Sequence, residues 1–191
     1  VSGNFNNNSM SNYSNTPITY MPTNTGYRLL IADNSSNGNR NNTNVNINYR
    51  HADTAGRELN MDADYGSYRL NNNQLQPNYY YNFSGSNELE RRVYNMIAPS
   101  KIDIATFKTD YEQPFAKGKL GIGGKFSLVE TTNNFERFNV FTSTKVLDTL
   151  RSNNFNYKEN INAGYVNYNR QYKGINIQLG VRVENTNATG T

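Results

Sequence analysis

The sequence predicts an all-β protein that folds as an antiparallel up-and-down meander of about seven strands. Apolar and polar residues alternate over several stretches, as they do when the two faces of a strand meet different surroundings. Leu is sparse, and no long apolar stripe recurs at helical spacing. Short connections also alternate with long polar stretches along the chain. The fold class therefore rests on strand periodicity and on the pattern of the connections.

Composition excludes several classes of function. Only 35% of the 191 residues are hydrophobic and the mean hydropathy is -0.84, which is low for a soluble sandwich with a core to cover. The chain has no Cys, so disulfides, thiol catalysis and zinc–thiolate sites are excluded. The net charge of +4 comes from scattered cations that form no basic stripe, so no nucleic-acid partner is expected. No apolar run has the length of a membrane helix.

The clearest pattern is a β-hairpin over residues 155–187, closed by a tight turn at residues 172–174. One face of its second arm is wholly apolar, with Ile175, Ile177, Leu179, Val181 and Val183, and the other is polar, with Asn176, Gln178, Gly180, Arg182 and Glu184. The first arm repeats the alternation, with Phe155, Tyr157, Ile161, Ala163 and Tyr165 opposite Asn156, Lys158, Asn160, Asn162 and Gly164. We expect the two apolar sets to share one face of the sheet.

The remaining elements follow in chain order. Strands are expected over residues 1–8, 42–52, 57–70, 101–113 and 119–130, with a short strand over 27–32. Long polar connections are expected over residues 9–41, 71–100 and 132–154, with a polar loop beginning at 185. Disorder is an equal alternative for residues 6–25, and residues 88–97 fit a short helix.

The connections indicate where the two ends of the sheet lie. The short turns at residues 53–56, 114–118 and 172–174 alternate strictly with the long polar connections, so all short turns fall at one end of an up-and-down sheet. This asymmetry is typical of transmembrane β-barrels, which have short periplasmic turns and long external loops. Strands of about 11–16 residues are long enough to cross a membrane at a tilt. We therefore expect residues 1–191 to form a single section of one barrel domain.

Seven short motifs occur along the strands and turns: Asn48-Tyr49-Arg50-His51, Gly56-Arg57-Glu58-Leu59, Asp62-Ala63-Asp64-Tyr65, Lys108-Thr109-Asp110-Tyr111 followed by Pro114, Leu120-Gly121-Ile122-Gly123-Gly124-Lys125, Phe155-Asn156-Tyr157-Lys158-Glu159-Asn160-Ile161 and Gly180-Val181-Arg182-Val183-Glu184-Asn185-Thr186. Together they resemble the TonB-dependent-receptor-like outer membrane β-barrel family common in Bacteroidetes. Each is short, and their order and spacing from residue 42 onward carry the resemblance. It implies a barrel section in the outer membrane of a Gram-negative cell. It also implies a plug, a TonB-contacting segment and further strands outside these residues.

Candidate site residues lie on the polar faces and in the polar connections. Seven charged residues are expected to face the lumen of a barrel, although solvated sheet charges are an equal interpretation: Arg50, Asp62, Asp64, Lys108, Asp110, Lys125 and Arg182. Arg50 is within diagonal cross-strand reach of Asp62, which favours an ion pair. Tyr79, Tyr80 and Tyr81 are candidate ligand contacts in an external loop, or could extend a strand into the interfacial belt.

Other chemistry is weakly indicated. His51, the single histidine, lacks the convergent ligands of a metal site, so neither a metal nor another cofactor is expected. Glu159 interrupts an apolar face and is expected at the outer rim, because a carboxylate in hydrocarbon is costly. Gly121, Gly123 and Gly124 lie inside a strand, so they indicate either small residues on the inner face of a barrel or room for a close neighbour, rather than a phosphate loop.

Two hypotheses follow. In the first, the chain contributes to solute binding and uptake across the outer membrane, with its external loops contacting a small solute, peptide or glycan. Its partners are then membrane lipid, the remainder of the barrel, a plug and TonB. In the alternative, it is a secreted or cell-surface β-sandwich that serves as a binding or adhesion module. An enzyme is not expected, since no catalytic set converges. Exposure of the apolar strand faces separates a lipid-facing barrel from a sandwich, which would bury them.

Overall fold

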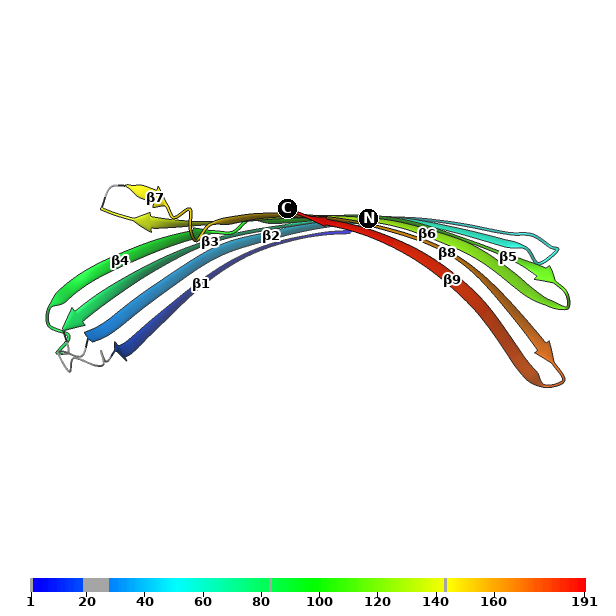
Figure 1. The fold of residues 1–191 in the computed structure, drawn as a ribbon, viewed down its shortest axis with the longest axis horizontal. Coiled ribbons are helices and arrows are strands. Elements are labelled where there is room, and N and C mark those ends of the chain that lie inside the picture. Colours follow the sequence, from blue (N-terminus) through cyan, green and yellow to red (C-terminus); the bar gives the residue numbers. More distant parts are fainter. Residues whose placement is uncertain (1, 19–27, 83, 143) are drawn as a thin grey trace.

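The computed structural model describes residues 2–18, 28–82, 84–142 and 144–191, and every regular element among them is a strand (Figure 1). The strands are β1 (Ser2–Ile18), β2 (Arg28–Ala52), β3 (Glu58–Asn82), β4 (Glu88–Ile97), β5 (Ser100–Phe115), β6 (Gly118–Val140), β7 (Lys145–Leu147), β8 (Asn153–Tyr172) and β9 (Ile175–Gly190). Val1 and Tyr27, which begin two of the expected strands, lie outside the described residues. The all-β prediction is confirmed.

The strands form one antiparallel sheet in the order β1-β2-β3-β4-β6-β8-β9. β5 also lies between β3 and β6, nearer to the short turns than β4 does. β4 and β5 form a single run along β3, because Asn73 pairs with Ile97 and Leu70 with Ser100 in one unbroken register. β7 is a three-residue excursion paired with the end of β6. The described sheet therefore consists of seven long antiparallel runs, as the sequence predicts.

The sheet is a single arched layer with almost no buried apolar core (Figure 1). Among the described residues, Ala32 and Ala163 are the only buried hydrophobic residues, and no large side chain is fully buried. The apolar side chains of β9 are open, with 65% of Leu179 and 71% of Val181 exposed. No second layer of the described chain covers the sheet, so the fold lacks the buried interface that defines a sandwich.

Most of the predicted long loops are strands in the structure. β2 and β3 reach well into residues 9–41 and 71–100, and β6 and β8 into 132–154. The expected helix over residues 88–97 is wrong, because this segment is β4. The final polar loop is also wrong, because β9 continues to Gly190.

Amide and hydroxyl side chains support these polar strands through bonds between neighbouring strands. Ser36 Oγ donates to Asn72 Oδ1 at 2.8 Å, and Asn95 Nδ2 donates to Asn73 Oδ1 at 2.6 Å. Such cross-strand pairs stabilise a sheet even where no apolar face is buried. These segments were predicted as loops because Asn and Ser are frequent in turns, whereas here both residues lie in strands.

The three short turns lie at the same end of the sheet, as predicted. The chain reverses after Ala52, at Ala116-Lys117 and at Lys173-Gly174. Both residues of the last two turns have positive φ, with values of 48° and 62° in the first and 47° and 82° in the second. Two positive φ values in a two-residue hairpin loop match a type I′ turn, whose twist suits the flanking strands.

The register of the β8–β9 hairpin corrects one prediction. Tyr168 pairs with Leu179 and Val166 with Val181, so the apolar face of β9 continues on the even-numbered residues of β8. Tyr165 instead pairs with Arg182. The set that was expected to join the apolar face therefore lies with the polar face of β9: Phe155, Tyr157, Ile161, Ala163 and Tyr165.

The apolar band on one face of the sheet drifts along the strands. On β9 it is centred on Leu179, whereas on β2 it is centred on Ile47. Ile47 lies in one hydrogen-bonded row with Ala63, Phe107, Phe126, Asn162 and Asn185. Across five strand spacings the band thus moves six residues, from position 179 to position 185 along β9. The short turns shift along the strands in the same direction. Ala52 is the last residue of β2 before its turn, and its hydrogen-bonded row meets β9 at Gly180, five residues beyond the first residue of β9.

Candidate functional site

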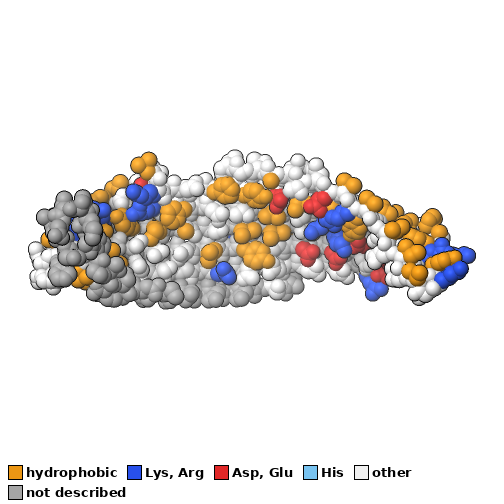
Figure 2. All heavy atoms as spheres, turned by 60° about the horizontal axis from the view of Figure 1, so that its bottom comes forward, with side chains coloured by type: hydrophobic (Ala, Val, Ile, Leu, Met, Phe, Trp, Pro, Cys, Tyr) orange, Lys and Arg blue, Asp and Glu red, His pale blue; other side chains and the backbone are white. Residues whose placement is uncertain are grey.

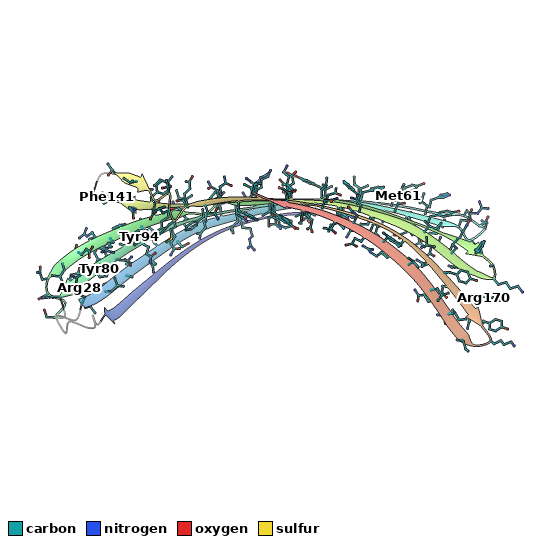
Figure 3. All side chains as sticks on the ribbon, viewed as in Figure 1. Arg28, Met61, Tyr80, Tyr94, Phe141 and Arg170 are labelled. Atoms are coloured by element: carbon teal, nitrogen blue, oxygen red, sulfur yellow. The ribbon has the colours of Figure 1, made fainter. Side chains whose placement is uncertain are left out.

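The sheet has two chemically different faces. Residues paired across antiparallel strands project to the same side, so the register assigns each side chain to a face. The outer face carries the apolar band, and Met61 of that face stands on the convex side of the arch (Figure 3). It also holds exposed Ile47, Phe107, Ile122 and Val166. The inner face is polar, and Figure 2, which turns the concave side forward, shows acidic and basic side chains gathered over the half that ends in the β8–β9 turn.

Bonds between neighbouring strands order the inner face. Asn46 Nδ2 donates to Asp64 Oδ1 at 2.6 Å, and Asn48 Nδ2 donates to Asp62 Oδ1. Arg50 does not pair with Asp62 as expected, because its Nε lies 2.9 Å from Glu58 Oε1 on the opposite diagonal. The two aspartates are therefore carboxylates in an amide ladder, each bonded to its own asparagine on β2.

The centre of the inner face is a contact that spans three strands. Tyr165 of β8 crosses β6 and donates its hydroxyl proton to Asp110 Oδ1 of β5. Lys108 Nζ lies 2.6 Å from the other carboxylate oxygen of Asp110. The crossing needs a residue without a side chain, because a Cβ atom on Gly123 would lie 2.3 Å from Cε2 of Tyr165. The sequence prediction of a close neighbour at this glycine is correct, but it did not find Tyr165.

The other predicted lumen-facing charges lie around this contact. The Arg182 guanidinium lies 5.7 Å from the centre of the Tyr165 ring and pairs with Glu184 at 2.6 Å. Lys125 lies directly opposite Lys108 in the register. All seven predicted charges therefore share the inner face, within the stretch of strand that also carries the apolar band outside.

Glu159 also lies on the inner face, in register with Val129 and Ala188. The expected place on the apolar face is therefore wrong, whereas the expected place near the external start of the strand agrees with β8, which begins at Asn153. The parity of the β8 residues explains it, because the odd-numbered side chains of this strand point away from the band. No carboxylate is placed in an apolar surrounding at this position.

The three consecutive tyrosines lie in β3 and not in a loop. They alternate between faces, so Tyr80 alone shares the inner face. Its ring lies 5.7 Å from the Arg92 guanidinium, and on the same face Tyr94 lies 4.0 Å from the guanidinium of Arg137. Tyr80, Tyr94 and Arg28 occupy the end of the arch remote from Arg170 (Figure 3). Sequence reasoning missed Tyr94 and Arg137, because both fell in segments taken for loop or helix.

The remaining candidates are simpler. His51 is exposed near the end of β2. In the described ranges no three His, Cys, Asp or Glu side chains come close enough to hold a metal ion. Likewise, no described helix could span a membrane.

A single antiparallel layer with one apolar and one polar face, and with all its short turns at one end, has the architecture of a transmembrane β-barrel wall. Comparison with known families agrees with this class. The profile of the outer membrane protein beta-barrel family matches residues 50–191, and the chain belongs to this family. The protein is accordingly located in the outer membrane, where its apolar face contacts lipid. No curated protein matches the chain.

Proposed function

We propose that the chain is the ligand-contacting section of a TonB-dependent-receptor-like barrel that takes up a solute across the outer membrane. The single observation that carries this proposal is the ordered polar inner wall. A hollow of about 260 Å³ is lined there by Asn60, Lys108, Asp110 and Asn167. Fixed donors and acceptors on a lumen wall suit a polar solute, or the surface of a plug that fills the barrel.

The external end of the inner face supports the ligand-binding part of the proposal. Tyr80 and Tyr94 present aromatic rings close to Arg92 and Arg137. Aromatic rings with guanidinium groups are suited to stacking against the apolar faces of a glycan or the side chains of a peptide. The register places these rings on the same face as the polar wall, so a bound ligand would lie over the route to the lumen.

The unpaired edges of the sheet support a larger barrel. Among the described residues, positions 46–52 of β2 pair only with β3, and β9 pairs only with β8. In hydrocarbon every backbone polar group needs a partner, so only closed barrels are stable there. We infer that further strands of the same barrel pair with both edges. A plug would contact the inner wall, and TonB would act through a segment elsewhere in the protein.

Uptake is tested with the full-length protein in its own cells. Membrane fractionation with a heat-modifiability gel establishes the folded barrel, and growth on candidate peptides and glycans is then compared in strains with and without the gene. Loss of growth on one nutrient, reproduced by removal of TonB, is the expected result. A gene deletion that changes uptake of no solute would overturn the transport proposal, although the barrel itself would stand.

No observation favours the sandwich alternative, since the apolar face of the described sheet is uncovered. The proposed role also contains no covalent step. Binding, positioning and passage of a solute account for the inner wall without an enzyme activity.

A further inference from the structure

Five charged residues project from the outer face beyond the external edge of the apolar band. Asp103 and Glu130 occupy one hydrogen-bonded row with Lys158, and Arg69 and Lys101 occupy the next outward row. Lys101 Nζ lies 2.6 Å from Asp103, and Lys158 Nζ lies 2.9 Å from Glu130. Charged side chains on a lipid-facing surface are costly in the hydrocarbon and tolerated near the membrane surface, so their depth in the membrane must be known.

The drift of the apolar band gives the tilt of the strands. A shift of six residues is about 20 Å along a strand, and five strand spacings are about 24 Å, so the strands are inclined by about 40° to the membrane normal. The drift of the turns gives nearly the same angle: five residues, about 17 Å, over four spacings, about 19 Å. Both values agree with the tilt of about 35–45° in outer-membrane barrels.

The tilt places the charged residues at one depth. Measured from the centre of the apolar band, all five lie about 16–22 Å toward the external side, although they belong to four strands. The hydrocarbon of a bilayer ends about 15 Å from its centre, and the headgroups extend to about 20–22 Å. The five side chains therefore form an arc at the level of the headgroups in the external leaflet.

We propose that Arg69, Lys101 and Lys158 bind the phosphate groups of phosphorylated lipids in the external leaflet. Two cations, Arg69 and Lys101, face each other directly across β3 and β5, an arrangement that an anion between them would stabilise. Among the described residues Arg69 has no ion-pair partner. The arc has three cations for two carboxylates, so its charge complements an anionic headgroup.

The carboxylates position the lysines. Asp103 accepts a hydrogen bond from Ser67 Oγ at 2.7 Å, which holds it between the two strands beside Lys101. Lys101 and Lys158 remain 48% and 69% exposed, so their ammonium groups can still take a second partner. The guanidinium of Arg69 can donate two parallel hydrogen bonds to one phosphate. Because the arc projects from the lipid-facing side, the occupant is a lipid and not a solute in the lumen.

The test measures lipid binding to the full-length protein in detergent by native mass spectrometry. The probes are lipid A with both phosphates and the same lipid after enzymatic dephosphorylation. We expect the phosphorylated lipid to bind at least tenfold more tightly. The triple variant Arg69→Gln, Lys101→Gln, Lys158→Gln should lose this preference, since each basic residue near a membrane surface contributes about fivefold in affinity.

The matched control is Lys119→Gln, which removes one cation from the inner face, and it should keep the preference. The variant Arg69→Lys, Lys101→Arg, Lys158→Arg should also keep it, and a heat-modifiability gel verifies the fold of each variant. Equal binding of the two lipids, or an unchanged preference in the triple variant, would overturn the proposal. Displacement of the lipid by millimolar inorganic phosphate would instead indicate a free-phosphate site, and would also overturn it. None of these outcomes depends on whether the barrel transports a solute.

Discussion

The ring of Tyr165 lies over Gly123, and its hydroxyl reaches Asp110 on the far side of β6. Three neighbouring strands are thereby joined by one side chain. A glycine inside a strand usually weakens it, because the backbone is freer and nothing packs. Here the missing side chain is the condition for the contact, so the glycine has a structural role.

The substitution Gly123→Ala should therefore destabilise the barrel. A Cβ atom would displace the Tyr165 ring and remove a hydrogen bond to a charged carboxylate, at a cost of about 2–3 kcal/mol. Urea unfolding of the full-length protein in detergent measures the change. Gly164→Ala is the matched control, because the added carbon would meet no described residue within 4 Å apart from its own chain neighbours. Equal stability of the two variants would contradict the close-contact interpretation.

Arginine substitutions should report the strand tilt. Leu179→Arg and Ile47→Arg both place a charge near the membrane centre and should each cost about 2–4 kcal/mol. Asn185→Arg should cost no more than about 1 kcal/mol, although Asn185 shares a hydrogen-bonded row with Ile47. Gln178→Arg on the inner face is the control. If Ile47→Arg and Asn185→Arg destabilised the barrel equally, the band would follow the rows and the tilt would be wrong.

Changing the residues of the turn between β5 and β6 should make the barrel more stable. Ala116 and Lys117 both have positive φ, a backbone conformation that residues other than glycine rarely adopt. Replacing them by Asn-Gly, the pair preferred in a type I′ turn, should stabilise the barrel by about 1–2 kcal/mol. The reverse change at the other such turn, Gly174→Ala, should destabilise it. Unfolding midpoints of both variants provide the check, and a loss in the first would refute the turn assignment.

The excursion around β7 should loosen in acid. The Arg151 guanidinium, 2.9 Å from Asp148, lowers the pKa of this carboxyl below its ordinary value, with a further contribution from Arg137. A lowered pKa in the folded state adds stability above the ordinary Asp pKa, and this stability is lost as the pH falls through the folded value. Hydrogen exchange at the amides of Asp148 and Arg151 should therefore speed up on acidification, beyond the intrinsic pH effect.

Asp148→Asn provides the comparison for that experiment. Its amides should already exchange fast at neutral pH, and should show no further opening in acid. The same opening with pH in both proteins would exclude Asp148 as the titrating group.

The alternation of apolar and polar residues identified the strand segments within the apolar band, but not the full length of the strands. Ile175 to Val183 and Val45 to Tyr49 alternate clearly, because lipid lies on one side and a polar space on the other. Beyond the band both faces are polar, so alternation vanishes although the strands continue. Residues such as Ser36 and Asn72, which bond to each other across strands, carry no signal of this kind in the sequence.

The side of the sheet on which Tyr165 lies could not be predicted from the sequence of β8 alone. Odd-numbered residues of β8 are apolar from Phe155 to Tyr165 with the exception of Glu159, yet the lipid-facing set begins at Gly164 and continues through Val166 and Tyr168. Two apolar patterns of opposite parity follow one another on this strand, and pairing with β9 decides between them. The charges of the inner wall were predictable because they alternate with the band on the same strands.

Pro99 separates β4 from β5 without changing the register, and Pro77 lies in β3 where the pairing with β2 is interrupted at Asp33 and Asn34. Proline has no amide hydrogen, so each position lacks one rung of the ladder. Both lie on the external side of the apolar band. The part of the sheet outside the membrane therefore has fewer backbone hydrogen bonds at these two positions than the part within the bilayer, where the pairing is uninterrupted.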